Sequence, residues 1–252
     1  MGIIGGRLGY NLLRMISPGG NQSMCSAGDP YGGASKLDIF FGSEFWADLQ
    51  GKVAIDFGCG VGTEAVEMAK RGASNVIGID IRENVLAEAR SLAVREGVEG
   101  RCTFCTATDS KVDLVVSLDA FEHFEDPQSV LESLRTMIQP HGKIWIVFGP
   151  PWYHPAGGHL FSVFPWAHLV FTESSLIRWR SDFKADGATR FSEVAGGLNQ
   201  MTVKRFKKLV SASPFRFDRL DLIPIRRLRH ISNRLTREFF TSCVRCRLVL
   251  RK

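Results

Sequence analysis

The sequence lacks any long hydrophobic run. Although 44 % of its 252 residues are hydrophobic, no apolar stretch approaches the roughly 18 residues that a membrane-spanning helix needs. The amino-terminal stretch MGIIGGRLGYNLLRMISPGG has neither the compact apolar core nor the small-residue cleavage site of a signal peptide. Internal repeats and low-complexity tracts are also missing. We therefore expect a cytoplasmic protein without a transmembrane segment, built as one large domain.

Acidic residues are scarce near the carboxyl end. Residues 200–252 contain 3 Asp/Glu and 15 Lys/Arg, whereas residues 1–199 contain 23 and 17, so the net charge of +6 is a carboxyl-terminal feature. Such a basic region can face an anionic substrate, a membrane surface or nucleic acid, or it can simply be a solvated surface.

Cysteine is also sparse. Four of the six cysteines form two C-x-x-C pairs, Cys102/Cys105 and Cys243/Cys246. Both pairs lie in strand-like runs, where positions i and i+3 point to opposite faces, so four thiolates would not converge on one zinc ion. We expect free thiols in a reducing compartment.

Strands and helices alternate from residue 52 onward. The expected strands span residues 52–58, 75–81, 101–107, 112–119, 142–149, 216–225 and 243–252. The expected helices span residues 36–50, 63–72, 83–97, 127–139, 202–213 and 226–240. Val/Ile-rich strands separated by helices form a largely parallel sheet covered on both faces, which predicts an α/β, doubly wound fold.

Two regions interrupt this alternation. Residues 1–35, rich in Gly, Ser, Asn and Pro, predict a loose amino-terminal arm with a short helix near residues 8–16. Residues 149–200 form an insertion after the fifth strand. We therefore predict an arm over 1–35 and a single domain over 36–252 that includes the insertion.

A glycine-rich turn follows the first strand. It reads Asp56-Phe57-Gly58-Cys59-Gly60-Val61-Gly62, and Asp80 ends the second strand 18 residues after Gly62. Glycines at a strand-to-helix turn let the backbone approach a ligand closely. The carboxylate before them suits an amine-bearing ligand, and an acidic residue at the second strand suits a ribose diol.

Four motifs, D-F-G-C-G-V-G, G-I-D-I, S-L-D-A-F-E-H-F-E-D-P and P-H-G-K, resemble those of the class I S-adenosylmethionine-dependent methyltransferases over roughly residues 50–148. The resemblance implies a Rossmann-like, seven-stranded sheet, mostly parallel with the last strand antiparallel. It also implies that the cofactor, S-adenosyl-L-methionine, lies across the ends of the first, second and fourth strands.

The resemblance assigns the cofactor contacts residue by residue. The glycine loop would line the methionine part, the end of the second strand would hold ribose and adenine, the residues after the third strand would approach the adenine amine, and those after the fourth would face cofactor or substrate. The loop residues are Asp56, Gly58, Gly60 and Gly62, and those at the end of the second strand are Asp80 and Ile81. The residues after the third strand are Thr108 and Asp109, and those after the fourth strand are Ser117, Leu118, Asp119 and His123. The stretch 109–111 is shorter than the family's usual loop.

The insertion begins with FGPPWYHPAGGH. Its Gly149–Trp152 element resembles the D/N/S-P-P-Y/W element of enzymes that methylate nucleobase amines, but it follows the fifth strand instead of the fourth. His154, His159 and His168 lack helical ligand spacing, so we expect no metal. Nine aromatics in residues 148–183, 25 % against 10 % overall, favour a lid over the ligand crevice; packing of the insertion on the sheet is the alternative.

The lid hypothesis nominates residues for the acceptor and for proton removal. Trp152, Tyr153, His154, His159 and Trp166 would line the substrate pocket, and His123, His154 and His159 are the candidate bases. Glu122 and Asp119 are alternatives.

These observations predict an enzyme that methylates a small molecule, aromatic or anionic, on oxygen. The alternatives are methylation of RNA or protein through the basic carboxyl-terminal region, with nucleic acid the less favoured partner, and a non-catalytic cofactor-binding module. The helix expected over 226–240 has one apolar stripe, which would pack on the sheet and leave its arginines free for an anionic acceptor.

Overall fold

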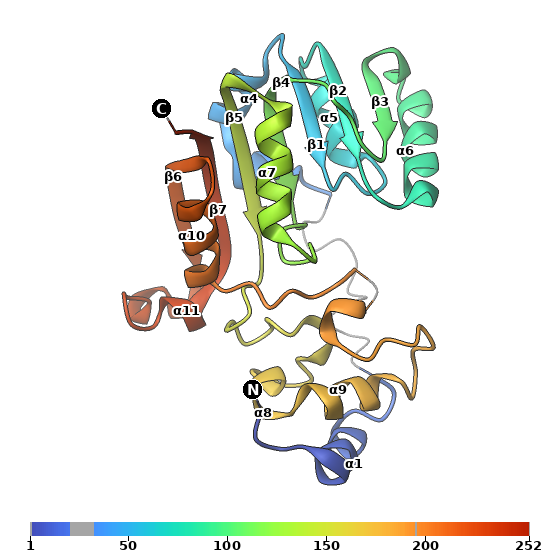
Figure 1. Ribbon diagram of the computed structural model, residues 1–252, viewed down its shortest axis with the longest axis vertical. Helices are drawn as coiled ribbons and strands as arrows, with labels where there is room; N and C mark the ends of the chain where they lie inside the picture. The colour runs from blue at the N-terminus through green and yellow to red at the C-terminus, as the bar shows by residue number, and fades with distance from the viewer. Residues whose placement is uncertain (1, 21–32, 195, 252) are drawn as a thin grey trace.

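A computed structural model describes residues 2–20, 33–194 and 196–251. A seven-stranded sheet of order β3-β2-β1-β4-β5-β7-β6 forms its body (Figure 1). The strands are β1 (Val53–Phe57), β2 (Asn75–Ile79), β3 (Cys102–Cys105), β4 (Val112–Leu118), β5 (Ile138–Phe148), β6 (Phe215–Pro224) and β7 (Thr241–Leu250). Strands β1 to β5 pair in parallel, and β7 runs antiparallel to both β5 and β6. The predicted fold class and the antiparallel direction of the last strand are confirmed.

Helices follow most strands and cover both faces of the sheet. The α-helices are α1 (Gly6–Ile16), α3 (Lys36–Phe40), α4 (Gly42–Leu49), α5 (Thr63–Lys70), α6 (Glu83–Arg95), α7 (Pro127–Met137), α8 (Ala167–Val170), α9 (Glu173–Arg180), α10 (Val203–Ala212) and α11 (Arg237–Phe240). The 3-10 turns are η1 (Glu99–Arg101), η2 (His159–Phe161), η3 (Phe191–Glu193) and η4 (Arg226–Ile231).

Two hydrophobic cores sandwich the sheet. Side chains alternate along each strand, so that Ala54 faces one core and Ile55 the other. The first core takes in α3, α4, α5 and α6, and the second takes in α7 and α10. The strand and helix alternation visible in the sequence therefore produces a three-layer arrangement. Open α/β sheets of this kind bind ligands at the carboxyl ends of their parallel strands.

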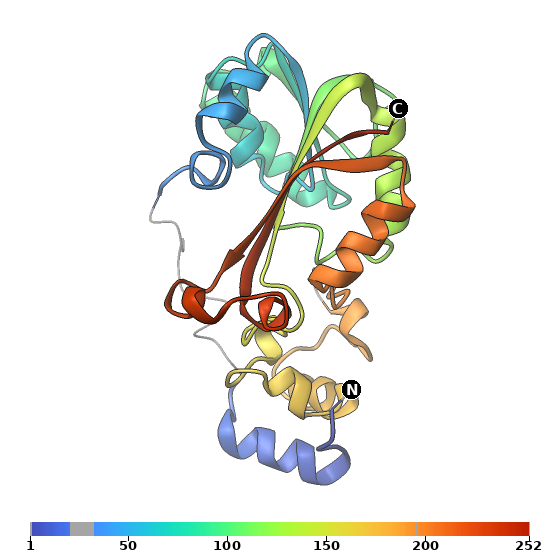
Figure 2. The same cartoon turned by 90° about the vertical axis from the view of Figure 1, so that its left-hand side faces the viewer.

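The insertion forms a third core below the sheet (Figure 2). Helix α1 packs on α9, and the backbone of Ile4 pairs with that of Phe171 in a parallel bridge. Leu13 of α1 is fully buried in this core. The part of the predicted arm that the structure describes is thus packed on the insertion; residues 21–32 lie outside the described residues, and the division of the chain at residue 35 stays a prediction.

Two expected helices are broken. The segment 36–50 divides at Gly42, whose φ of 64° is the left-handed conformation that glycine tolerates. The segment 226–240 forms only η4 and the single turn α11, because the side-chain oxygen of Asn233 accepts the N–H groups of Leu235 and Thr236 in a local turn.

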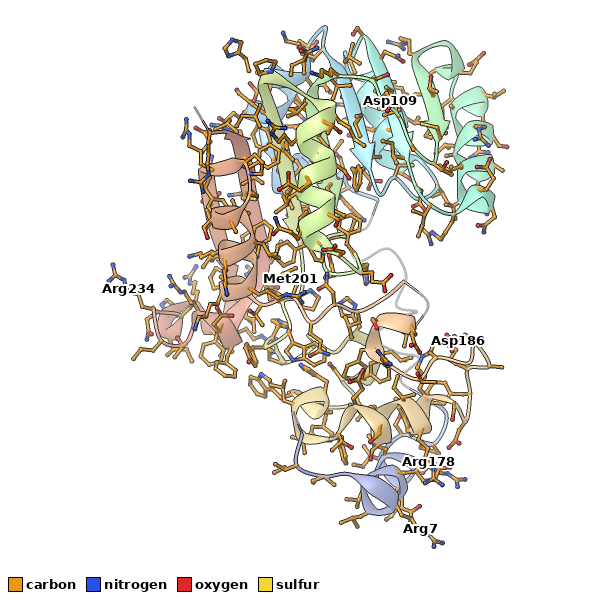
Figure 3. The ribbon with its side chains drawn as sticks, in the orientation of Figure 1. Arg7, Asp109, Arg178, Asp186, Met201 and Arg234 are labelled. Carbon is orange, nitrogen blue, oxygen red and sulfur yellow. The ribbon has the colours of Figure 1, made fainter. Side chains whose placement is uncertain are left out.

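The apolar stripe of segment 226–240 consequently does not pack on the sheet. Leu235 is 89 % exposed, Ile231 51 % and Phe239 40 %, and Figure 3 shows Arg234 pointing away from the body. Among the described residues, no helix is long and apolar enough to cross a membrane.

The two C-x-x-C pairs lie far apart in the sheet. Cys102 and Cys105 are on the edge strand β3, whereas Cys243 and Cys246 are on β7. All four are free thiols, as the sequence predicts.

Candidate active site

The glycine loop joins β1 to α5 in the conformation that its sequence predicts. Gly58, Gly60 and Gly62 have φ values of 85°, 50° and 79°. Two of them are also close to neighbours: a Cβ at Gly58 would lie 2.9 Å from the Cβ of Ala120, and one at Gly62 would lie 2.8 Å from the Cβ of Ala89. Glycine is therefore required both by the turn and by the packing around it.

Asp80 lies directly beside this loop and accepts four N–H groups. Its Oδ2 accepts from the backbone of Gly60 at 3.0 Å and from the Arg82 guanidinium at 3.0 Å, and its Oδ1 accepts from the backbone and Nε of Arg82 at 3.0 and 2.9 Å. Burial opposes ionisation, but the bonds and charge of Arg82 outweigh it and hold the pKa of Asp80 below its usual value.

Asp56 lies at the end of β1 and is buried. Its Oδ2 has no hydrogen-bond partner among the described residues. Burial, followed by the charge of Glu64, raises the pKa of Asp56 well above its usual value. A buried carboxyl oxygen without a donor is costly to leave unpaired, so it is suited to accept one from a ligand held by the loop.

Lys36 is a site residue that the sequence did not single out. Its ammonium lies 3.0 Å from Asp119 after β4 and 3.8 Å from Glu64 at the start of α5. The side chain comes from α3, 20 residues before Asp56, and no local motif marks it. The fold alone brings a cation to the glycine loop.

The segment after β4 lies beside the glycine loop, where Ala120 packs against Gly58. Asp119 has a left-handed φ of 49°, uncommon for a residue other than glycine and typical of functional sites. Ser117 is buried and its hydroxyl has no partner among the described residues. The Asn199 amide group donates to the carbonyls of Phe121 and Phe124, both at 2.8 Å, which fixes the segment in place.

The histidines of the insertion differ in their roles. His168 uses both ring nitrogens inside the protein, with Nε2 2.6 Å from the carbonyl of Trp152 and Nδ1 3.1 Å from Ser162 Oγ. His154 Nδ1 accepts the N–H of Ala156 at 3.0 Å. Burial lowers the pKa of both rings to about 4. His168 is therefore structural, and His154 is a weak base at neutral pH.

His123 and His159, from different segments, lie together. Their ring centroids are 5.2 Å apart. His123 Nδ1 lies 2.9 Å from the carbonyl of Gly197, whereas His159 Nε2 is buried without a partner among the described residues. Burial lowers the pKa of His159 to about 4.

Glu122 adjoins this pair. Its Oε1 accepts the N–H of Gly149 at 3.2 Å, and its Oε2 is buried with no partner in the described part of the chain. Burial raises the pKa of Glu122 to about 8.

The predicted substrate aromatics divide into buried and half-buried. Trp152 is 5 % exposed and packs against His168 and Phe191 in the third core. Its ring is part of the insertion's interior, which favours the packing alternative for this residue. Tyr153 and Trp166 are half-buried, and the Trp166 Nε1 donates to the Tyr153 carbonyl at 2.8 Å. A role of the predicted residues in lining a substrate pocket stays a prediction.

The adenine contacts are the least supported by geometry. Ile81 is 88 % exposed beside Asp80, so its side chain can cover a ligand. Asp109 is exposed in the β3–β4 connection and lies on the upper part of the sheet in Figure 3, above the carboxyl ends of the strands. Thr108 Oγ1 accepts the N–H of Ser110. A contact of Thr108 and Asp109 with the adenine amine stays a prediction.

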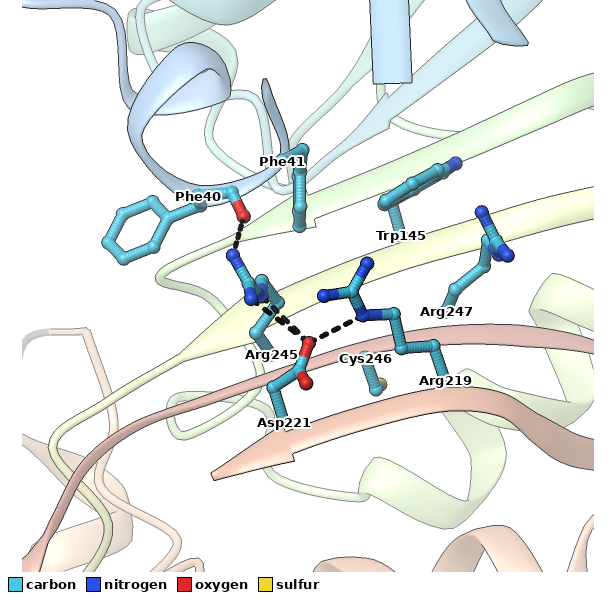
Figure 4. A pocket seen from close by; sticks show the side chains of 8 residues that line it. All are labelled: Phe40, Phe41, Trp145, Arg219, Asp221, Arg245, Cys246 and Arg247. Carbon is cyan, nitrogen blue, oxygen red and sulfur yellow. Dashed lines mark hydrogen bonds and ion pairs between the residues drawn. The ribbon is translucent and has the colours of Figure 1, made fainter. Parts of the chain in front are cut away.

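A separate cavity of about 90 Å³ lies between α3 and strands β5 to β7. Figure 4 shows Asp221 bridging Arg219 and Arg245, and Arg245 donating to the carbonyl of Phe40. The cavity is small, and each charged group that lines it is paired: Arg219 and Arg245 with Asp221, and Arg247 with Glu44 and Asp218. Its lining includes neither the glycine loop nor Asp80 nor Asp119.

The family model described as a methyltransferase domain matches residues 55–146. This match places a methyltransferase domain in that segment of the chain. Over 104 residues it is 38 % identical to the ubiquinone biosynthesis O-methyltransferase of Aeromonas salmonicida, a match that covers 39 % of this chain and 43 % of the relative. The chain therefore spans under half the length of this curated relative.

Solved structures support the methyltransferase fold over a larger part of the chain. An S-adenosylmethionine-dependent methyltransferase from Mesorhizobium loti has a TM-score of 0.54 at 19 % identity, covering 80 % of this chain and 92 % of that one. A second, described as a putative enzyme of this kind from Listeria monocytogenes, has a TM-score of 0.55 at 14 % identity, covering 81 % and 93 %. At these identities the likeness shows the fold of the methyltransferase domain and its C-terminal strands, not the acceptor.

Proposed function

We propose that this protein is an S-adenosylmethionine-dependent methyltransferase that methylates an oxygen atom of a small molecule. The observation that carries the proposal is the arrangement of the glycine loop, the unpartnered carboxyl oxygen of Asp56 and the carboxylate of Asp80 at one edge of the sheet. The name of the curated relatives, ubiquinone biosynthesis O-methyltransferase, supports oxygen as the acceptor atom.

The residues present fit the cofactor. Asp56 Oδ2 would accept a donor from its amino acid part, and Lys36, 3.0 Å from Asp119, offers a cation for its carboxylate. Asp80 would hold the ribose hydroxyls, with Ile81 beside the adenine. When bound, the cofactor supplies an activated methyl group on a sulfonium, so the protein has to position the acceptor and assist loss of its proton.

Proton removal is the weaker part of a histidine-base mechanism. Imidazoles with a pKa near 4, as in His154 and His159, are poor proton acceptors for a phenolic hydroxyl whose own pKa is about 10. His123, whose ring centroid lies 5.2 Å from that of His159, remains the candidate base when no metal is bound.

The RNA or protein alternative depends on a free basic surface. Several basic residues of the carboxyl-terminal strands are engaged within the protein: Arg219 and Arg245 pair with Asp221, and Arg247 pairs with Asp218 and Glu44. These pairs favour a structural role for the charge on β6 and β7 and leave η4, α11 and the exposed basic residues of α10 as the basic surface.

A methyl-transfer assay tests the proposal. The purified protein is incubated with methyl-labelled S-adenosylmethionine and separate panels of phenols and catechols, amines, total RNA and total protein. We expect label in the methyl ether of a hydroxyl compound. Label in RNA or protein alone would replace this proposal with the alternative, and binding of the cofactor without transfer to any panel would favour the non-catalytic module.

A further inference from the structure

One group of three metal-ligand side chains occurs among residues 2–20, 33–194 and 196–251. Glu122, His123 and His159 each present one ligand atom, and these atoms lie within 4.8 Å of one another. Glu122 and His123 follow β4, whereas His159 begins η2 in the insertion. The three come together only because the insertion folds under the carboxyl edge of the sheet, so the sequence spacing gave no indication of a site.

We propose that Glu122, His123 and His159 bind a divalent transition-metal ion of the zinc type. The inference rests on the proposed function only for what the ion would do; whether it binds is independent of any methyl transfer. It replaces the expectation that the chain holds no metal, which considered His154, His159 and His168 as the ligand set.

Unpaired buried atoms are the first observation that points to a ligand. Glu122 Oε2 and His159 Nε2 are both buried, and neither has a hydrogen-bond partner in the described part of the chain. A buried polar atom without a partner costs about 1–3 kcal/mol, and native structures contain few of them. Two in one cluster of ligand-type residues indicate that something binds there.

The second observation is the orientation of His123. Its Nδ1 lies 2.9 Å from the carbonyl of Gly197, which can only accept, so Nδ1 carries the proton and Nε2 has the free lone pair. Metal-ligating histidines usually donate their other ring N–H to a carbonyl or carboxylate in this way. His159 also has a left-handed φ of 50°, a strained backbone of the kind that functional sites retain.

The donor set selects the ion. Two imidazoles and one carboxylate suit zinc and its first-row neighbours, whereas magnesium and calcium prefer oxygen ligands. Ligand atoms on one zinc ion with bonds of about 2.1 Å lie about 3.4 Å apart, so the side chains need to close by about 1.5 Å at most from the 4.8 Å separation.

Three protein ligands leave one position open, as in catalytic zinc sites. The site adjoins Asp119 and Lys36, whose charges act on Glu122. A hydroxyl of the acceptor bound at the open position would lose its proton to solvent more readily, because the cation stabilises the oxyanion. This would remove the need for a strongly basic histidine.

The test is metal binding to the untagged protein without cofactor or acceptor. Protein stripped with a chelator is titrated with Zn²⁺ by calorimetry, and with Co²⁺ while its visible absorption is recorded. We expect one ion per chain and intense Co²⁺ bands of a four- or five-coordinate site. Glu122→Gln and His159→Gln should each weaken Zn²⁺ binding by more than about 100-fold. Loss of a residue that only hydrogen-bonds to a metal ligand typically weakens binding by about 10–100-fold.

Two controls keep the result interpretable. His141→Gln changes an exposed histidine on β5 and should leave Zn²⁺ affinity unchanged. Glu122→Gln keeps an oxygen for the Gly149 N–H and a neutral side chain of the same size, so it should fold in the absence of metal, as circular dichroism would check. Binding below one ion per chain, or equal affinity in wild type and both site variants, would overturn the proposal.

A parallel titration with S-adenosylhomocysteine separates this inference from the proposed function. Cofactor binding without metal binding would refute the metal site and leave the methyltransferase proposal standing. Metal binding without cofactor binding would support the metal site and refute the methyltransferase proposal.

Discussion

Arg82 should compete with the cofactor for Asp80. A carboxylate has about four lone-pair positions, and in this structure Gly60 and the Arg82 backbone use two while the Arg82 side chain uses the other two. The guanidinium also lies over the glycine loop, 4.0 Å from the Cβ that Gly60 would have. A ribose diol can bond to Asp80 only if the Arg82 side chain moves away.

The magnitude follows from the exposure of the Arg82 side chain, since Asp80 itself is buried. The Arg82 side chain is 57 % exposed, and exposed ion pairs contribute about 0.2–1 kcal/mol. Two parallel bonds place this one in the upper half of that range, about 0.5–1 kcal/mol. Arg82→Ala should therefore raise the affinity for S-adenosylhomocysteine by about 2–5-fold.

Isothermal calorimetry of wild type and Arg82→Ala at low and high salt measures the effect. Salt screens exposed charges, so wild-type affinity should rise with ionic strength and the variant's should not. Arg95→Ala is the control and should behave as wild type. Arg95 is an exposed arginine in the last turn of α6, the helix that begins directly after Arg82. Weaker binding by Arg82→Ala would show that Arg82 contacts the cofactor, which would refute this reasoning.

Three further predictions concern packing and binding. Gly62→Ala should lower the free energy of unfolding in urea by about 2–4 kcal/mol, because the new Cβ adds left-handed strain and a contact 2.8 Å from Ala89. The control Gly97→Ala, at a φ of 68° with open space around it, should lower it by only about 1–2 kcal/mol. Equal losses in the two variants would contradict the close packing at Gly62. Trp152→Ala should lower the free energy of unfolding by about 3–5 kcal/mol, at least about 2 kcal/mol more than Tyr153→Ala. A larger loss in Tyr153→Ala would mean that Trp152 lines a pocket. Removing EDTA-accessible metal should abolish methyl transfer and added Zn²⁺ should restore it; full activity of metal-free protein would exclude a catalytic role for the ion.

Local pattern predicted the sheet and the conformation of the glycine loop well, because both depend on short-range features. Val/Ile runs set the strands, and glycines at residues 58, 60 and 62 set a turn with left-handed φ values. Lys36 and the grouping of Glu122 with His159 could not be predicted, since each depends on a contact between distant segments.

The expected helix over 226–240 failed for a different reason. Its apolar spacing was helical, but Asn233 captured the N–H groups of the following turn, and the stripe stayed exposed. Aromatic enrichment in the insertion was likewise ambiguous, because the same composition serves a pocket or a core. Trp152 lies in the core.

The most direct test of the account is calorimetric titration of S-adenosylhomocysteine into the wild-type protein and Asp80→Ala. Wild type should bind one molecule per chain, and loss of a charged hydrogen-bond acceptor worth about 1.5–3 kcal/mol per bond should weaken binding by at least about 10-fold. Absence of binding to folded wild-type protein, or equal affinity in both proteins, would contradict the assignment of this edge of the sheet to the cofactor.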